Sequence, residues 1–109
     1  MLNALDDATR QSTADFLSDM QDMDGGLLAN SRIPVADILS TFTGVLTLAD
    51  IDYLDVIDAA AALRFTQSLE RPEGGFLAAL WDETPDVEYT FYGLGCLALL
   101  TPAARHFDS

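Results

Sequence analysis

The hydrophobic and polar positions of this chain fall into four blocks of two kinds. Residues 7–21 and 55–69 carry charged side chains along their length, and their apolar residues recur at helical spacing, which predicts helices with one wet face. Residues 38–49 and 89–104 contain no charged residue. Because a helix that is apolar all round must be buried, the sequence predicts two outer, charged helices and two inner, uncharged ones.

The four blocks also form an internal repeat. Residues 16–48 recur as residues 65–97 at a constant offset of 49, with ten identities. The repeated unit predicts two helical hairpins, at about 7–49 and 55–100, within one domain of residues 1–109. Two stacked hairpins leave apolar faces of the inner helices in water. We therefore expect the chain to be part of a longer protein or set of proteins, or to self-associate as a homo-oligomer.

Glycine pairs mark the turn of each hairpin. The pairs at 25–26 and 74–75 follow the outer helices, and glycine adopts the left-handed backbone that ends a helix without steric cost. Asp37 and Asp86 are predicted in the first turns of the inner helices, where a carboxylate complements the helix dipole.

The ends and contacts of the inner helices give three smaller expectations. Residues 50–53, Asp-Ile-Asp-Tyr, are predicted to cap the second outer helix, and residues 101–109, which contain Pro102, are predicted to be a fraying end. Small residues on the inner helices predict close approach of helix backbones, namely at Gly44, Gly93, Gly95 and Ala98.

The charge balance excludes one class of partner. The chain has 18 acidic residues against five basic ones, all of them arginine, and a net charge of −13. Because binding to phosphate groups requires clustered cations, we expect no nucleic acid and no anionic membrane surface as a partner. An acidic surface that favours solubility explains this balance; adaptation to high salt and a basic docking partner are the alternatives.

Three further patterns concern the compartment. Cys96 is the only cysteine, so the chain has no internal disulfide, and the first residues lack the pattern of a signal peptide. The longest uncharged run, 89–104, is interrupted by glycine and proline and is short for a membrane span. These patterns predict a cytoplasmic protein without a membrane span.

One segment carries a family resemblance. Residues 74–100, GGFLAALWDETPDVEYTFYGLGCLALL, combine a Gly-Gly-Phe turn, a spacer and Asp-x-x-Tyr-Thr-Phe-Tyr, and they resemble the repeat of the protein prenyltransferase β-subunit and terpenoid (squalene) cyclase superfamily. Residues 25–48 resemble it more weakly, and residues 16–27 resemble the glutamine–tryptophan motif of squalene cyclases, with Gln21 in place and Leu27 where Trp is expected. The resemblance implies an all-α fold, here a partial α/α toroid of two repeats, whose inner helices line an apolar funnel for an isoprenoid chain.

The same resemblance implies a catalytic zinc ion. In protein prenyltransferases it is held by an Asp, by a Cys two residues later and by a His from a later repeat. Asp86 matches the Asp, but Glu88 stands where the Cys is expected and Tyr89 where the His is expected, so the ligand set is incomplete. Asp86 and Glu88 are the metal candidates that are left. The alternative for both is a carboxylate at the helix start, and Glu88 has the further alternative of facing the funnel.

Five aromatic residues are candidates for lining a funnel of this kind: Phe42, Trp81, Tyr89, Phe91 and Tyr92. The alternative is ordinary packing in the core and between the hairpins. Five arginines, dispersed along the sequence, offer little for a diphosphate group, whose binding normally requires a convergent basic cluster.

The sequence leaves three functions open. The first is a divergent prenyltransferase-type toroid module that binds an apolar, isoprenoid-like ligand, with prenyl transfer only in the presence of additional repeats. The second is a non-catalytic helical-repeat scaffold for protein–protein interaction. The third is an active transferase, as the resemblance implies, which would need stoichiometric zinc. The sequence alone identifies no catalytic residue.

Overall fold

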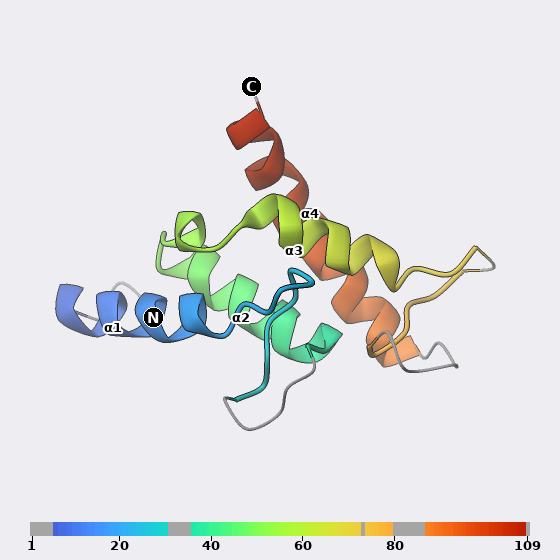
Figure 1. Cartoon of the computed structure of the whole chain (residues 1–109), viewed down its shortest axis with the longest axis horizontal. Helices are drawn as coiled ribbons and strands as arrows, with labels where there is room; N and C mark the ends of the chain where they lie inside the picture. Colours follow the sequence, from blue (N-terminus) through green and yellow to red (C-terminus); the bar gives the residue numbers. More distant parts are fainter. Residues whose placement is uncertain (1–5, 31–35, 73, 80–86, 109) are drawn as a thin grey trace.

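Two helical hairpins make up the described part of the chain (Figure 1). This computed structural model describes residues 6–30, 36–72, 74–79 and 87–108, and the side chains of these except 87 and 105–108. Within them, the helices are α1 (Asp7–Asp19), α2 (Ile38–Asp50), the 3₁₀ helix η2 (Leu54–Val56), α3 (Ala59–Ser68) and α4 (Val87–Asp108). No β-strand occurs among the described residues, and the predicted all-α fold is confirmed.

Aspartate side chains start three of the described helices. The carboxylates of Asp6, Asp37 and Asp58 accept hydrogen bonds of 2.7, 2.7 and 3.0 Å from the backbone N–H group three residues later. All three have extended backbone, as the position before a helix requires. Asp37 is therefore the residue that caps α2 rather than a member of its first turn. Asp86 lies outside the described residues.

The link between the hairpins differs from the prediction. Residues 50–53 do not cap the second outer helix, which begins at Ala59 instead of near Asp55. Asp52 has a left-handed φ of +65°, which ends α2, and η2 then fills part of the link. The helix starts only after Asp58, because that carboxylate is the one that reaches the free N–H groups of its first turn.

The turns of the two hairpins are built alike. In the first, the N–H of Leu28 donates to the carbonyl of Met20 at 2.8 Å; in the second, Leu77 donates to Leu69 at 2.9 Å. Both pairs are separated by the repeat offset of 49. The predicted left-handed glycines are present, with φ of +99° at Gly25 and +101° at 74. The hydrogen bond and the first glycine therefore repeat in the backbone, whereas the second glycine does not, because Gly75 has a φ of +85° and Gly26 is outside the left-handed region.

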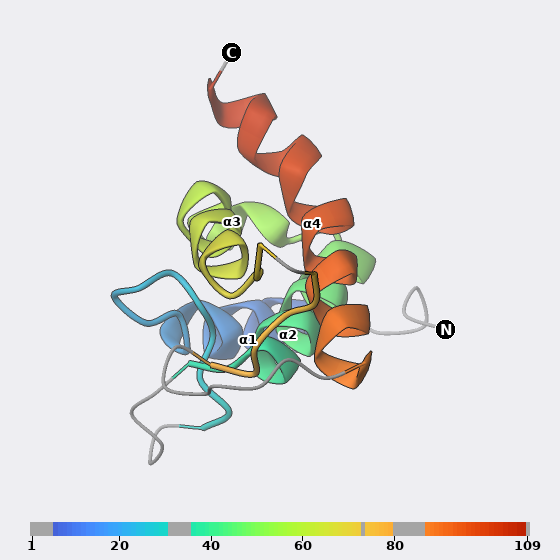
Figure 2. The same ribbon diagram turned by 90° about the vertical axis from the view of Figure 1, so that its right-hand side faces the viewer.

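The inner helix α4 holds the two hairpins together. Both α2 and α3 pack against α4, and α1 lies on the far side of α2 (Figures 1 and 2). The core between these helices contains large side chains that are at most 2% exposed, among them Phe65, Phe76, Leu27, Ile38, Leu48 and Leu100. The predicted division into outer and inner helices agrees with this packing.

The inner helices are not covered on all sides. Leu39 and Leu46 of α2 and Phe91 and Leu94 of α4 are all exposed. These residues lie in the two segments without charge, so the expectation that inner helices would present apolar faces to water is confirmed. No helix of the described residues has the length and apolar character to cross a membrane.

Glycines of the inner helices receive side chains rather than helix backbones. A Cβ atom at Gly44 would collide with the Leu27 side chain, and one at Gly93 would collide with the Phe76 ring, which is the equivalent pair in the second hairpin. A Cβ at Gly95 would collide with the Phe42 ring, and Ala98 is exposed. The prediction of backbone-to-backbone packing is therefore wrong, because each glycine makes a notch for one large apolar side chain.

The end of the chain is also more ordered in the fold than predicted. Helix α4 continues through Pro102 to Asp108, and its last turns extend past the other helices (Figures 1 and 2). Pro102 has no N–H to donate to the carbonyl four residues earlier. The side chains of Leu100 and Ala104, on either side of this proline, are buried.

Candidate functional site

Three of the five predicted aromatic residues meet between the inner helices. The ring centroid of Phe42 on α2 lies 5.9 Å from that of Phe91 and 5.6 Å from that of Tyr92, both on α4. The rings of Phe91 and Tyr92 are 5.8 Å apart. Two of the three pairs are edge-to-face, the arrangement that ring quadrupoles favour. We call these three residues the aromatic cluster.

The aromatic cluster is anchored at one ring and open at another. Phe42 is half-buried because Gly95 leaves space for its ring. Phe91, in contrast, is 65% exposed. The cluster therefore presents an aromatic surface to solvent, and it does so from two helices whose relative position is fixed by a packed contact.

A polar group adjoins the cluster at the start of α4. The hydroxyl of Tyr92 donates a 3.0 Å hydrogen bond to Oε1 of Glu88, one helical turn earlier. This bond to a carboxylate raises the pKa of the Tyr92 phenol, and partial burial and the nearby negative charge act in the same direction. Glu88 lies in the first turn of α4 and also fixes an aromatic ring, so both roles considered for it, at the helix start and toward the candidate site, are compatible with its position.

The other predicted residues are not part of the cluster. Tyr89 is partly buried and packs against the hydrophobic core, which is the alternative considered for these aromatics; Phe42 and Tyr92 of the cluster pack against that core as well. Trp81, like Asp86, lies outside the described residues.

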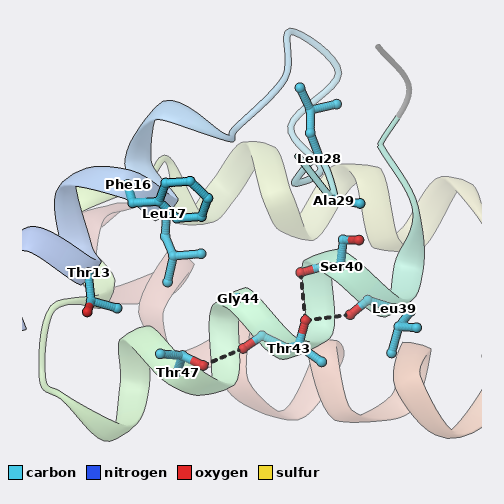
Figure 3. A pocket seen from close by; sticks show the side chains of 10 residues that line it. All are labelled: Thr13, Phe16, Leu17, Leu28, Ala29, Leu39, Ser40, Thr43, Gly44 and Thr47. Atoms are coloured by element: carbon cyan, nitrogen blue, oxygen red, sulfur yellow. Dashed lines mark hydrogen bonds between the residues drawn. The ribbon is translucent and has the colours of Figure 1, made fainter. Parts of the chain in front are cut away.

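A concave surface lies between α1 and α2 (Figure 3). This α1–α2 groove has a volume of about 500 Å³ and is lined by Thr13, Phe16, Leu17, Leu28, Ala29, Leu39, Ser40, Thr43, Gly44 and Thr47. The hydroxyls of Thr43 and Thr47 donate to helix carbonyls at 3.0 and 2.8 Å, so their methyl groups add to the apolar lining. Phe16 is 55% exposed at its edge.

Sequence reasoning did not find the α1–α2 groove. The available signal was the match of Phe16 with Phe65, its counterpart in the second hairpin. Phe65 is 2% exposed, whereas Phe16 is largely uncovered. A repeat in the sequence shows that two residues occupy equivalent positions. It does not show that another hairpin covers one of them and leaves the other exposed.

Comparison with known families decides the relationship of this chain. The family model described as prenyltransferase alpha-alpha toroid domain matches residues 1–108. The chain belongs to this family. None of the curated proteins compared with the chain matches it.

Membership in the prenyltransferase alpha-alpha toroid family raises the question of zinc. Among the described residues, no three His, Cys, Asp or Glu side chains come together as a metal site. The only thiol, Cys96, is fully buried, and burial raises its pKa to about 12. Zinc requires a deprotonated thiolate, so this cysteine does not suit the metal. The described residues do not fit the zinc site of the family's transferases.

Two of the arginines in this toroid domain serve the fold. One guanidinium nitrogen of Arg10 donates to the carbonyl of Ile51 at 2.7 Å, and the group also lies 5.7 Å from the centre of the Tyr53 ring. Arg71 donates to the carbonyl of Ser68 at 2.9 Å. These two cations stabilise chain segments outside the aromatic cluster.

Proposed function

We propose that this chain is a divergent prenyltransferase-type toroid module that binds an apolar, isoprenoid-like ligand. The observation that carries the proposal is the aromatic cluster of Phe42, Phe91 and Tyr92, which joins the two inner helices and leaves Phe91 65% exposed. Flat aromatic rings on a rigid helical support offer a surface for the methyl and alkene groups of an isoprenoid chain.

The ligand surface extends along the inner helices. Leu46 and Leu94 are exposed on α2 and α4, the same two helices that carry the aromatic cluster. A surface open to water binds weakly, because an apolar ligand gains most when it is enclosed. We therefore propose that additional hairpins, from further repeats or from another copy, complete the binding site. Prenyl transfer belongs to the proposal only for such an assembly.

Titration with a fluorescent farnesyl analogue tests this function. We expect saturable binding, and we expect Phe91→Ala to weaken it by about tenfold, which corresponds to about 1.4 kcal/mol. Met23→Ala is the matched control, because Met23 is fully exposed and lies in the first turn, away from the cluster. Binding that does not saturate, or that Phe91→Ala and Met23→Ala leave equally strong, would contradict the proposal.

The exposed leucines favour a second candidate function, a non-catalytic scaffold for protein contacts. Leu39, Leu46 and Leu94 are apolar side chains of the size found in protein interfaces, and they lie on helices rather than on loops. This function predicts association without any response to the farnesyl analogue. The titration therefore separates the two candidates.

A further inference from the structure

The two hairpins of the chain meet in a close-packed joint. The first turn lies flat on α3: a Cβ at Gly25 would collide with the backbone carbonyl of Ala61, and one at Gly26 would lie 2.6 Å from the Phe65 ring. The side chain of Gln21 adds two hydrogen bonds, of 3.0 and 2.8 Å, to the backbone carbonyl and N–H of Asp58. One hairpin therefore offers its turn, and the next receives it on its outer helix.

The offering half of this joint occurs a second time, uncovered. Gly74 has the left-handed backbone of Gly25, yet a Cβ there would meet no described atom within 4 Å. Leu94 is 55% exposed, whereas its counterpart Val45 is fully buried. We call Gly74, Gly75 and Leu94 the trailing face.

The receiving half is also repeated and uncovered. Phe65 is 2% exposed, with its ring against Gly26 of the first hairpin, and Ala62 is fully buried. Their counterparts at the offset of 49 are Phe16 and Thr13, which line the α1–α2 groove (Figure 3). Ala29 and Thr43, also in this groove, are exposed, whereas their counterparts in the second hairpin are half-buried. The groove is therefore the receiving surface of the same joint.

We propose that a second copy of this chain docks its trailing face into the α1–α2 groove and continues the stack head to tail. The turn at 74–75 of one copy lies on Phe16 of the next, as the turn at 25–26 lies on Phe65 within the chain. Leu94 becomes covered, as Val45 is. A second copy is the occupant because one chain carries both halves of the joint, in the register of the repeat. This inference rests on the proposal that additional hairpins complete the module.

Two positions limit how closely the second joint follows the first. Glu70 stands where the first hairpin has Gln21, and a carboxylate cannot donate to a backbone carbonyl as the Gln21 amide donates to that of Asp58. Leu46 stands where the second hairpin has Gly95, the notch that admits the Phe42 ring. Phe91 cannot enter the next copy as Phe42 enters α4, so it stays with the aromatic cluster. The joint between copies is therefore smaller than the joint within the chain, and the association is reversible.

Charge makes this association dependent on salt. Each copy carries a net charge of −13, so two copies repel each other. The Debye length falls from about 10 Å at about 0.1 M salt to about 3 Å at about 1 M. Because the proposed joint is largely apolar, it strengthens as the repulsion is screened.

Sedimentation velocity at these two salt concentrations tests the proposal. We expect a mass above the 11.8 kDa of one chain that grows with protein concentration and with salt. Phe16→Asp blocks the groove and Leu94→Glu blocks the trailing face, so each weakens association by about tenfold or more. Met23→Asp, a charge placed on a fully exposed side chain outside both surfaces, leaves it unchanged. Circular dichroism confirms that the three variants keep the wild-type helix content.

A mixture of the two blocked variants identifies the geometry. The Phe16→Asp chain keeps its trailing face and the Leu94→Glu chain keeps its groove, so the mixture forms a pair of chains and stops there. A head-to-tail joint has two different halves, and only such a joint is restored by mixing. Wild-type chains that stay at 11.8 kDa at both salt concentrations, or variants that remain monomeric when mixed, would overturn the proposal.

The two proposals fail separately. Chains that stay monomeric but bind the farnesyl analogue overturn the second copy as the partner and leave the ligand function standing. Chains that associate head to tail but do not respond to the analogue overturn the ligand function and leave the joint standing.

Discussion

The first and second hairpins share one plan and differ in what surrounds it. In each, a residue of the turn inserts into a glycine notch on the inner helix: Leu27 at Gly44, and Phe76 at Gly93. In each, a threonine hydroxyl of the inner helix accepts a hydrogen bond from the backbone N–H of that same turn residue. These contacts all lie within one hairpin. The burial of the hairpin's outer surface depends instead on which other part of the structure packs against it.

The contrast is sharpest where equivalent residues have opposite surroundings. Phe65 is buried under the first turn, and Phe16 is exposed in the α1–α2 groove. Gly25 touches α3, and Gly74 meets no described atom within 4 Å. Equivalent substitutions in the two hairpins therefore separate what the hairpin itself requires from what its neighbour requires.

The largest difference is expected at the phenylalanine pair. Phe65→Ala removes a ring that is 2% exposed and should lower the free energy of unfolding by about 3–5 kcal/mol. Phe16→Ala removes a ring that is 55% exposed and should cost less than about 1 kcal/mol. Urea unfolding at a protein concentration low enough to prevent association measures both. Equal decreases in the free energy of unfolding would contradict this prediction, because they would mean that the two rings are equally buried.

The glycine pair should show the next largest difference. Gly25→Ala and Gly74→Ala share the strain of a left-handed alanine, about 1–2 kcal/mol. Only Gly25→Ala also drives a Cβ atom into the carbonyl of Ala61, and overpacking of this kind adds about 1–3 kcal/mol.

Urea unfolding of the two alanine variants isolates this added cost. The strain common to both glycines cancels in the comparison, so the difference between their losses reports the contact with α3. A loss for Gly74→Ala as large as that for Gly25→Ala would place a neighbour on the second turn within the single chain.

The pairs also show what could be predicted from the sequence. Gly25 and Gly74 predicted the turns, and the uncharged segments predicted which helices are the inner ones. Both features depend on local backbone geometry and composition. The start of α3 was misplaced, since both Asp55 and Asp58 are able to cap a helix and only the fold of the link selects Asp58.

The candidate site was predictable only in part, for a related reason. Phe42, Phe91 and Tyr92 meet, as residues on facing inner helices would. Tyr89 packs against the core, but so do Phe42 and Tyr92, so contact with the core does not by itself distinguish Tyr89 from the aromatic cluster. The exposure of Phe16 was not predictable. The turn of the first hairpin covers Phe65, but no described hairpin lies over Phe16 in the same way.

The threonine pair should give a smaller difference. Thr41→Val leaves the buried N–H of Leu27 without its 2.9 Å acceptor, and an unsatisfied buried donor costs about 1–3 kcal/mol. Thr90→Val removes a longer bond, 3.3 Å to the N–H of Phe76, at a half-buried position, so its cost should be at most about 1 kcal/mol.

Amide hydrogen exchange at the two turn residues reads this effect directly. Exchange at Leu27 should accelerate more in Thr41→Val than exchange at Phe76 does in Thr90→Val. The reverse order would mean that the second turn, not the first, depends on its threonine.

The pair of Cys96 and its counterpart Thr47 gives the smallest effect on stability at neutral pH, and its difference is measured as the reactivity of a thiol at each position. Cys96 is fully buried, and burial raises the pKa of its thiol to about 12, whereas Thr47 lines the α1–α2 groove. Because the thiolate is the reactive form, native Cys96 should not react with a disulfide reagent at pH 8 until the chain unfolds. A cysteine placed by Thr47→Cys in a Cys96→Ala background should react while the chain is folded.

The same thiol makes stability depend on pH in one direction. The folded pKa of Cys96 lies above the value of about 8.5 for an unfolded cysteine, so the fold keeps the proton that the unfolded chain gives up. Below that unfolded value the thiol adds no dependence on pH. As the pH rises from there toward the folded value, the free energy of unfolding should fall by up to about 1.4 kcal/mol per unit. Cys96→Ala should remove this slope, whereas Thr47→Cys in that background should restore less of it, because position 47 is half-buried at the groove and Cys96 is fully buried.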